Sequence, residues 1–355
     1  MSLRRAPDLV EFGTIPASAW TSGALPQRSL MQTHDWLSAA AETYGQGQHT
    51  LALLPGGLAD PRGLALLGRA RAGGLRLLGS IDIGESVELL WRDSDALEEL
   101  ARGLTRLGVA VELGHYPNGL DFAAKLRRVQ GQRGMTVARA LPQRAAPCLP
   151  LDDSWQDPLR HFGAKRRQRF RRKWRKAERF GPIAVEIAAP SEVDLDRQFD
   201  RAIAIEARSW KGRAGSALMH DERQAVFFRD FGRRMAAKGQ LRLCFLTIGG
   251  ADAAVEYAVV WQNRFWSIKL GYDDAFAEFS PGEALRLELV RHSAEKGYDA
   301  FEFCGKEADW TKGWTDRATE IAALRIYPFT LAGLGKLAYD GCEIGRRRLR
   351  AATSP

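Results

Sequence analysis

The fold of this chain is decided by residues 271–314, GYDDAFAEFSPGEALRLELVRHSAEKGYDAFEFCGKEADWTKGW. Residues 280–283 (SPGE) predict a helix start: Ser caps a helix, Pro suits its first position, and Glu three residues after the cap completes a capping box. Apolar residues then recur at helical spacing as far as Lys296-Gly297, a typical helix end. Residues 298–303 and 265–271 alternate as half-buried strands do. The stretch predicts a strand–helix–strand unit whose helix N-terminus offers free N–H groups to an anion.

The residues upstream extend this unit into a domain. Periodicity and turn residues predict the order β-α-α-β-β-β-α-β, with a Gly249-Gly250 turn and an Asn263-Arg264 turn between strands. The predicted elements before the helix at 281 are strand 183–188, helices 192–208 and 221–238, and strands 240–248, 253–261 and 265–271.

The first part of the chain also alternates between strand-like and helix-like segments. Strands are predicted at 50–55, 63–70, 74–81, 86–93, 109–113 and 135–140, and helices at 34–44, 95–107 and 121–131. Three prolines in residues 142–150 indicate a linker, and a strand at 317–327 and a helix at 331–350 follow the second domain. We therefore expect four parts: an N-terminal domain (1–150), a basic amphipathic helix (151–182), a C-terminal domain (183–330) and a basic C-terminal helix (331–355).

The net charge of +9 is concentrated in one segment. Lys165–Arg179 holds ten Lys and Arg with a single Glu, and the rest of the 355 residues is nearly neutral. Apolar residues at helical spacing, Phe162, Phe170, Trp174 and Ala177, form a narrow stripe on this helix. The sequence leaves two interpretations of this helix open. It is either a solvated helix that packs on a domain through that stripe, or an arm that binds an anion. The candidate anions are a nucleotide or CoA phosphate, anionic lipid headgroups, and RNA.

Composition excludes several classes of protein. The four cysteines are widely spaced with no C-x-x-C pair, and the six histidines show no metal-binding spacing, so we expect no disulfide, metal or permanent cofactor. No apolar run approaches the ~18–20 residues of a membrane span, and the N-terminus lacks the apolar core of a secretory signal. A cytoplasmic location, at most peripheral to the inner face of the membrane, is the expectation.

Two blocks of sequence carry a family resemblance. Residues 206–218 (EARSWKGRAGSAL) form one, and the other is the GYD strand end, SPG helix start, KGYDAFEF strand and Lys/Trp turn of 271–314. These resemble the CelD/BcsL acetyltransferases of the GNAT superfamily, relatives of the FemAB-type transferases. The resemblance covers about residues 155–330 and is weaker before residue 150, where residues 36–45 carry it. It implies an α/β (α+β) fold of two GNAT-like domains, each a mixed, mostly antiparallel sheet flanked by helices.

The resemblance also implies a donor site. GNAT enzymes transfer an acyl group directly from a thioester, holding the CoA pyrophosphate at a helix N-terminus and the pantetheine between two splayed strands. The matching positions are Gly271, Tyr272, Ser280, Pro281, Gly282 and Glu283. The usual phosphate loop, Q/R-x-x-G-x-G/A, does not occur in this chain, so the donor stays open between acyl-CoA and the aminoacyl-tRNA of FemAB-type enzymes.

Charged residues within strand-like runs are the candidates for catalysis, because burying them unpaired is costly. Glu256 or Glu302 is expected as general base, since an apolar site raises the pKa of a carboxylate. The alternative is an outward-facing strand residue. In the Lys/Trp turn, Lys312 or Lys306 is expected to bind phosphate or to stabilise an oxyanion.

Further residues of the two family blocks are expected on the acceptor side: Glu206, Trp210, Lys211, Arg213, Lys306, Trp310 and Trp314. Solvated lysines and a packing tryptophan are the alternative.

The predicted function is an acyl-CoA-dependent N- or O-acyltransferase that acts on an envelope precursor: a lipid amine, an amino sugar or an exopolysaccharide unit. An anionic membrane is a candidate partner through Lys165–Arg179. The rivals are an aminoacyl-tRNA-dependent transferase, with nucleic acid otherwise not expected, and a non-catalytic subunit of a polysaccharide synthase.

Overall fold

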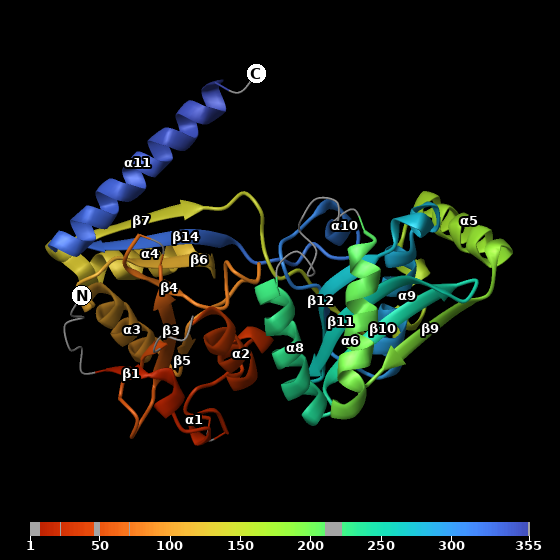
Figure 1. The fold of residues 1–355 in the computed structure, drawn as a ribbon, viewed down its shortest axis with the longest axis horizontal. Coiled ribbons are helices and arrows are strands. Elements are labelled where there is room, and N and C mark those ends of the chain that lie inside the picture. The colour runs from red at the N-terminus through yellow and green to blue at the C-terminus, as the bar shows by residue number, and fades with distance from the viewer. Residues whose placement is uncertain (1–7, 22, 46–49, 71, 210–221, 354–355) are drawn as a thin grey trace. The chain divides into compact units, whose positions relative to one another are not determined.

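A computed structural model describes residues 8–21, 23–45, 50–70, 72–209 and 222–353 (Figure 1). The chain divides into two compact units, Met1–Ala145 with Thr319–Pro355, and Ala146–Ala318. The sequence placed residues 319–330 in the C-terminal domain, whereas in the structure they pair with strands of the first unit. The pairing is long-range, and nothing local in the sequence specifies it.

The first unit is built on one sheet with the strand order β1-β2-β3-β4-β6-β14-β7, and β5 pairs with β3. Only the β4–β6 pair is parallel among these pairings. The strands are β1 (Leu9–Glu11), β2 (Leu51–Leu53), β3 (Gly63–Arg69), β4 (Leu75–Leu77), β5 (Leu90–Trp91), β6 (Val111–Pro117), β7 (Gly134–Ala140) and β14 (Ile321–Pro328).

Two helices of this unit begin where a polar side chain caps them. Thr33 accepts from the amide of Trp36 at 3.2 Å, and Asp93 accepts from the amide of Ala96 at 2.9 Å. The helices are α1 (Ser18–Thr21), α2 (His34–Tyr44), α3 (Ser94–Arg106), α4 (Gly119–Gln130) and α11 (Leu331–Thr353). The predicted helices at 34–44, 95–107, 121–131 and 331–350 are thus confirmed to within a few residues. The predicted strand at 86–93 is wrong in length, since only Leu90 and Trp91 pair.

The second unit holds a sheet with the order β8-β13-β12-β11-β10-β9. Its strands are β8 (Cys148–Pro150), β9 (Ile183–Ala188), β10 (Leu241–Ile248), β11 (Ala251–Trp261), β12 (Arg264–Tyr272) and β13 (Ala300–Glu302). The β10–β11 and β11–β12 hairpins turn at Gly249-Gly250 and Gln262-Asn263, where all four residues have positive φ as tight hairpins require. The second turn therefore starts one residue earlier than predicted.

The expected linker 142–150 is partly a strand. Residues 148–150 form β8 and pair with β13, while Ala145 bridges Thr319. Three prolines favour an extended chain, and the free edge of β13 gives the last part of it a hydrogen-bonding partner.

Helices cover both faces of the second sheet. α6 (Glu192–Ala207) and α8 (Glu222–Ala237) pack on the face that carries Tyr257, whose ring lies 5.4 Å from that of Phe228 and 6.3 Å from that of Phe199. α9 (Pro281–Glu295) packs on the opposite face, in a core that includes Ala254, Ala258, Phe265 and Phe301. The mixed α/β fold class, with two sheets flanked by helices, is confirmed.

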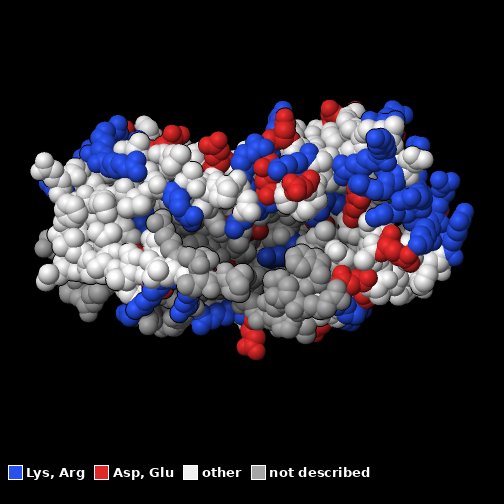
Figure 2. Space-filling view, turned by 90° about the horizontal axis from the view of Figure 1, so that it is seen from above, with Lys and Arg blue, Asp and Glu red and all other residues white. Residues whose placement is uncertain are grey.

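The basic segment forms α5 (Ala164–Phe180) in the second unit. Ala177 is buried, and Phe170 and Trp174 pack against the core beneath α9, as the predicted apolar stripe requires. The remaining side chains are mostly basic, and Figure 2 shows Lys and Arg gathered over this helix. One face of α5 thus docks the helix, and the other presents cations to solvent.

Candidate functional site

The neighbouring strands β12 and β13 separate in the middle of the second sheet. They pair in parallel at Arg264–Ala300, Phe265–Phe301 and Trp266–Glu302, and their pairing ends there. β12 continues to Tyr272 on β11 alone, with a bulge at Ile268 where the β11–β12 register shifts. A bulge bends a strand and re-aims its side chains, and such bulges are frequent beside active sites. The pairing of these two strands thus ends in the part of the sheet where a GNAT fold is expected to diverge.

A buried polar cluster lies next to this point. Glu256 of β11 is fully buried, accepts a short hydrogen bond from Ser267 Oγ of β12, and faces Arg286 of α9, with Nη2–Oε distances of 3.3 and 3.5 Å. Arg286 is 5% exposed, and its guanidinium carbon lies 4.1 Å from the ring centroid of Trp310. The cluster joins both strands of the second hairpin, the helix α9 and the Lys/Trp turn.

Glu302 has a different environment. Its neighbour Phe301 stacks on Phe265 in the core beneath α9, so Glu302 points to the other face of the sheet, where it pairs with Arg264. Burial raises the pKa of Glu302, and the Arg264 guanidinium opposes that shift only in part. Burial next to the Glu302 carboxylate also raises the pKa of the Cys148 thiol to about 12. Glu256 and Glu302 are thus not brought together.

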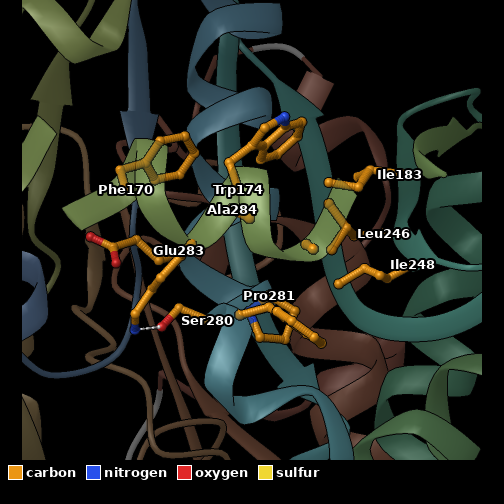
Figure 3. Close-up of a pocket in the computed structure, with 12 residues that line it drawn as sticks. Phe170, Trp174, Ile183, Leu246, Ile248, Ser280, Pro281, Glu283 and Ala284 are labelled. Carbon is orange, nitrogen blue, oxygen red and sulfur yellow. Dashed lines mark hydrogen bonds between the residues drawn. The ribbon is translucent and has the colours of Figure 1, made fainter. Parts of the chain in front are cut away.

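The N-terminus of α9 lies under the basic helix (Figure 3). Pro281 is the first helical residue, as predicted, but the predicted capping box does not form. Ser280 has a left-handed backbone (φ 54°), and its Oγ accepts a short hydrogen bond from Lys173 Nζ. Glu283 pairs with Arg166 at 3.2 Å and Arg169 at 3.6 Å. The two polar side chains contact cations of α5 instead of each other.

A pocket lies between α5 and the start of α9, and it is mainly apolar. Its walls include Phe170, Trp174, Ile183, Leu246, Ile248 and Phe279, while Lys173, Ser280 and Glu283 supply the polar part (Figure 3). An apolar pocket with a few convergent polar groups is typical of a ligand site. Arg166 also donates to the carbonyl of Gly313, so it ties α5 to both α9 and the Lys/Trp turn.

The glycines of the expected donor site have packing roles in this structure. A Cβ on Gly271 would lie 3.0 Å from Cβ and 3.1 Å from Cα of Glu206, so Gly271 lets α6 approach β12 closely. A Cβ on Gly282 would meet the flexible Leu270 side chain at 3.1 Å. Tyr272 is half-buried and packs against the core beneath α9, and Glu206 is buried on α6.

The Lys/Trp turn contains the short helix α10 (Asp309–Lys312). Lys312 pairs with Asp309 at 3.3 Å on the surface, and Lys306 is exposed. Trp310 is 47% exposed and covers Arg286, whereas Trp314 is buried against Phe162 at 5.0 Å. Trp310 therefore joins the buried cluster, and Trp314 belongs to the core.

Trp210, Lys211 and Arg213, expected on the acceptor side, lie outside the described residues. Arg286 and Ser267 were not singled out from the sequence. One signal was present for Arg286: it occurs where an apolar residue is expected, one turn before Leu289 and Val290 on the buried face of α9. A cation on a buried helix face indicates a paired or functional group.

Comparisons with known proteins agree with this architecture. Residues 164–312 match the family described as acetyltransferase (GNAT) domain. A crystal structure of FemX aligns with a TM-score of 0.58 and 12% identity, covering 90% of this chain and 96% of that one. A conserved protein of unknown function from Bacteroides thetaiotaomicron aligns with a TM-score of 0.58 and 11% identity, covering 88% and 97%.

A third solved structure is the C-terminal domain (DUF2156) of a protein described as a lysylphosphatidylglycerol synthetase from Agrobacterium fabrum. It aligns with a TM-score of 0.51 and 12% identity, covering 90% and 94%. No protein in the set of curated sequences matches this chain. At 11–12% identity these likenesses establish the fold. The protein is an acyltransferase, and its residues 164–312 match a GNAT acetyltransferase domain. Its fold over most of the chain is similar to that of FemX.

Proposed function

We propose that the second unit transfers an acyl group from acyl-CoA to an envelope acceptor, as the CelD/BcsL resemblance implies. The observation that carries this proposal is the separation of β12 and β13 directly beside the buried cluster of Glu256, Ser267 and Arg286. A thioester threaded between separated strands would bring its reacting carbon next to buried polar groups, where electrostatic stabilisation is strongest because water is excluded.

The donor's phosphates are proposed to lie at the N-terminus of α9. The first-turn N–H groups of a helix favour an anion, and Arg169 and Lys173 add two cations beside them. The Glu283 carboxylate opposes these charges, and Glu278, two residues before the N-cap, is paired with Lys176. The local balance favours a polyanionic donor such as CoA.

In the proposed reaction the acceptor amine or hydroxyl attacks the thioester carbonyl carbon. A C–N or C–O bond forms, the C–S bond breaks, and the CoA thiolate leaves. Glu256 is proposed to take the proton that the acceptor loses, and the thiolate is then protonated to the thiol. Lys312 pairs with Asp309 at the surface and is assigned no step.

The acceptor is proposed to lie at an anionic membrane surface, as a lipid amine or another envelope precursor. Four cations of α5 are exposed and contact no part of the α9 helix start in the described contacts: Arg171, Arg172, Arg175 and Arg179. Clusters of Lys and Arg are attracted to anionic lipids by about 1 kcal/mol per residue. The lysylphosphatidylglycerol synthetase of similar fold is named for a lipid product, which supports this class of acceptor.

The C-terminal helix α11, in the first unit, also has features that suit a membrane surface. Gly333 and Asp340 face the body of the unit, while the opposite side of the helix is exposed and uncharged. That exposed side comprises Leu331, Leu334, Ala338, Gly341, Cys342, Gly345 and Leu349. Four arginines follow in residues 346–350. An apolar stripe on a helix whose sequence continues with arginines suits a helix lying on an anionic membrane. Among the described residues no helix is long and apolar enough to cross a membrane.

Thermal stabilisation of the purified protein by free CoA, acetyl-CoA and palmitoyl-CoA tests the donor. A ligand at ~100 times its dissociation constant adds ~2.7 kcal/mol to the folded state, which a melting curve resolves. The order of the three ligands separates small-acyl transfer from long-chain transfer. No shift with any CoA compound would overturn the proposed donor.

Two further tests address the rival functions. Activity lost on RNase treatment would favour the aminoacyl-tRNA rival. An unchanged phenotype after substitution of Glu256 would favour a non-catalytic subunit.

A further inference from the structure

Arg286 has a buried donor without an acceptor. Its side chain is 5% exposed, and Nη2 lies 3.3 Å from Glu256 Oε1. Nε is buried and has no hydrogen-bond partner among the described residues. The carboxylate therefore engages one nitrogen of the guanidinium at a long distance and leaves the neighbouring Nε–H unused.

An ion pair that served packing alone would be expected to use both nitrogens. A carboxylate matches the Arg fork bidentately, with two short parallel hydrogen bonds, and such pairs are the strong ones. Leaving a buried donor unsatisfied costs about 1–3 kcal/mol. Glu256 is held away from that geometry because its Oε1 also accepts from Ser267. The second hydrogen bond thus leaves the buried Nε–H of Arg286 without an acceptor.

This unpaired donor belongs to a cluster that adjoins the end of the β12–β13 pairing. Ser267 follows Trp266, the last residue of β12 that pairs with β13, and its hydroxyl contacts the same carboxylate as Arg286. Trp310 covers the face of the guanidinium at 4.1 Å, which fixes its plane and shields it from water. A neutral oxygen acceptor fits this environment, because the Arg286 charge is already partly balanced by Glu256.

We propose that Arg286 Nε–H donates a hydrogen bond to the carbonyl oxygen of the acyl donor. The inference rests on the proposed function and names a catalytic residue for it. As the acceptor attacks the carbonyl carbon, negative charge develops on that oxygen, and the hydrogen bond from a buried cation strengthens. The C–S bond then breaks, the oxygen returns to a carbonyl, and Arg286 keeps its protons throughout. The same donor serves a thioester or an aminoacyl ester, since both present an acyl carbonyl.

The Nε–H group can be observed directly by NMR in protein labelled with ¹⁵N at arginine Nε, and Arg286→Lys assigns its signal. Acetyl-CoA is compared with S-ethyl-CoA, a thioether that lacks the carbonyl oxygen, and with CoA. The Arg286 signal is expected to shift and to exchange more slowly with acetyl-CoA alone. Arg291, on the same helix and paired with Glu288 at 2.8 Å, is the internal control and should not respond.

The kinetic arm uses Arg286→Gln, with Arg291→Gln as the matched control. Arg286→Gln is expected to lower kcat about 10²–10³-fold, the loss seen when an oxyanion donor is removed, with the donor KM changed only a few-fold. In this variant acetyl-CoA should no longer bind more tightly than S-ethyl-CoA. Since an unpaired Glu256 can unfold the protein, the double variant Glu256→Gln/Arg286→Gln keeps the pair neutral for the ligand-binding measurements.

The outcomes separate this inference from the proposed function. CoA compounds could raise the melting temperature while acetyl-CoA, S-ethyl-CoA and CoA affect the Arg286 signal equally. The proposed donor class would then stand, and this inference would be overturned. If no CoA compound binds but a stable amide of aminoacyl-adenosine moves the signal, the inference stands and the donor class falls. If neither probe moves the signal, the inference is overturned.

Discussion

Glu256 and Glu302 point to opposite faces of the second sheet. Glu256 faces Arg286 of α9, whereas Glu302 pairs with Arg264 on the side away from α9. Two carboxylates that looked equivalent in the sequence therefore have different partners, and one site cannot use both.

Neutral substitutions should separate their roles. Glu256→Gln is expected to lower kcat by about 10²–10⁴, the usual contribution of a general base. Glu302→Gln should leave kcat within a few-fold, because Glu302 lies across the sheet from the Glu256 cluster. Steady-state kinetics with melting temperatures for both variants provides the measurement. Equal kcat losses at equal stability would contradict the assignment of Glu256.

Glu302 should also make stability depend on pH. Burial raises its pKa above the ordinary 4.5, with Arg264 opposing, so the folded state binds the proton more readily than the unfolded state. Between the unfolded and folded pKa values the native state then holds more protons, and stability falls as pH rises. Glu302→Gln cannot ionise, so its stability relative to wild type should increase as pH rises from 4.5. Urea unfolding from pH 4 to 7 measures this difference, and a flat difference would refute it.

Two faces of α5 should bind different anions. Arg169→Gln/Lys173→Gln removes two cations beside the α9 N-terminus. It is expected to weaken CoA binding at least about tenfold for each cation removed, since a charge-assisted hydrogen bond contributes about 1.5–3 kcal/mol. Arg172→Gln/Arg175→Gln removes the same charge from the outer face. It should weaken binding to anionic vesicles and leave CoA affinity unchanged. Calorimetry and vesicle co-sedimentation compare the two variants, and equal effects in both assays would show a non-specific charge effect.

Substitution of Gly271 and of Gly282 by alanine should change the stability of the protein by different amounts. Gly271→Ala places a Cβ 3.0 Å from Glu206 Cβ and 3.1 Å from its Cα, so α6 must move, with an expected loss of about 1–3 kcal/mol. Gly282→Ala meets the flexible Leu270 side chain, and alanine favours a helix, so stability should change by less than about 1 kcal/mol. If phosphate approaches the α9 start closely, Gly282→Ala lowers CoA affinity without unfolding. Chemical denaturation and CoA binding measure both variants. A stable Gly271→Ala protein would argue against the packing role.

The sequence by itself determined the order of the elements of the second unit from β9 to β13, whereas β8 was expected as part of a linker. Alternation predicted β10, β11 and β12, the SPGE segment predicted the start of α9, and helical spacing predicted the stripe that docks α5, because these signals are local. The tertiary structure decided the rest. It placed β14 in the first unit, turned Ser280 and Glu283 toward α5, and set Arg286 against Glu256, residues 30 positions apart. Such pairings depend on which strands and helices meet, and the free energy that selects them comes from long-range burial, which no short stretch of sequence encodes.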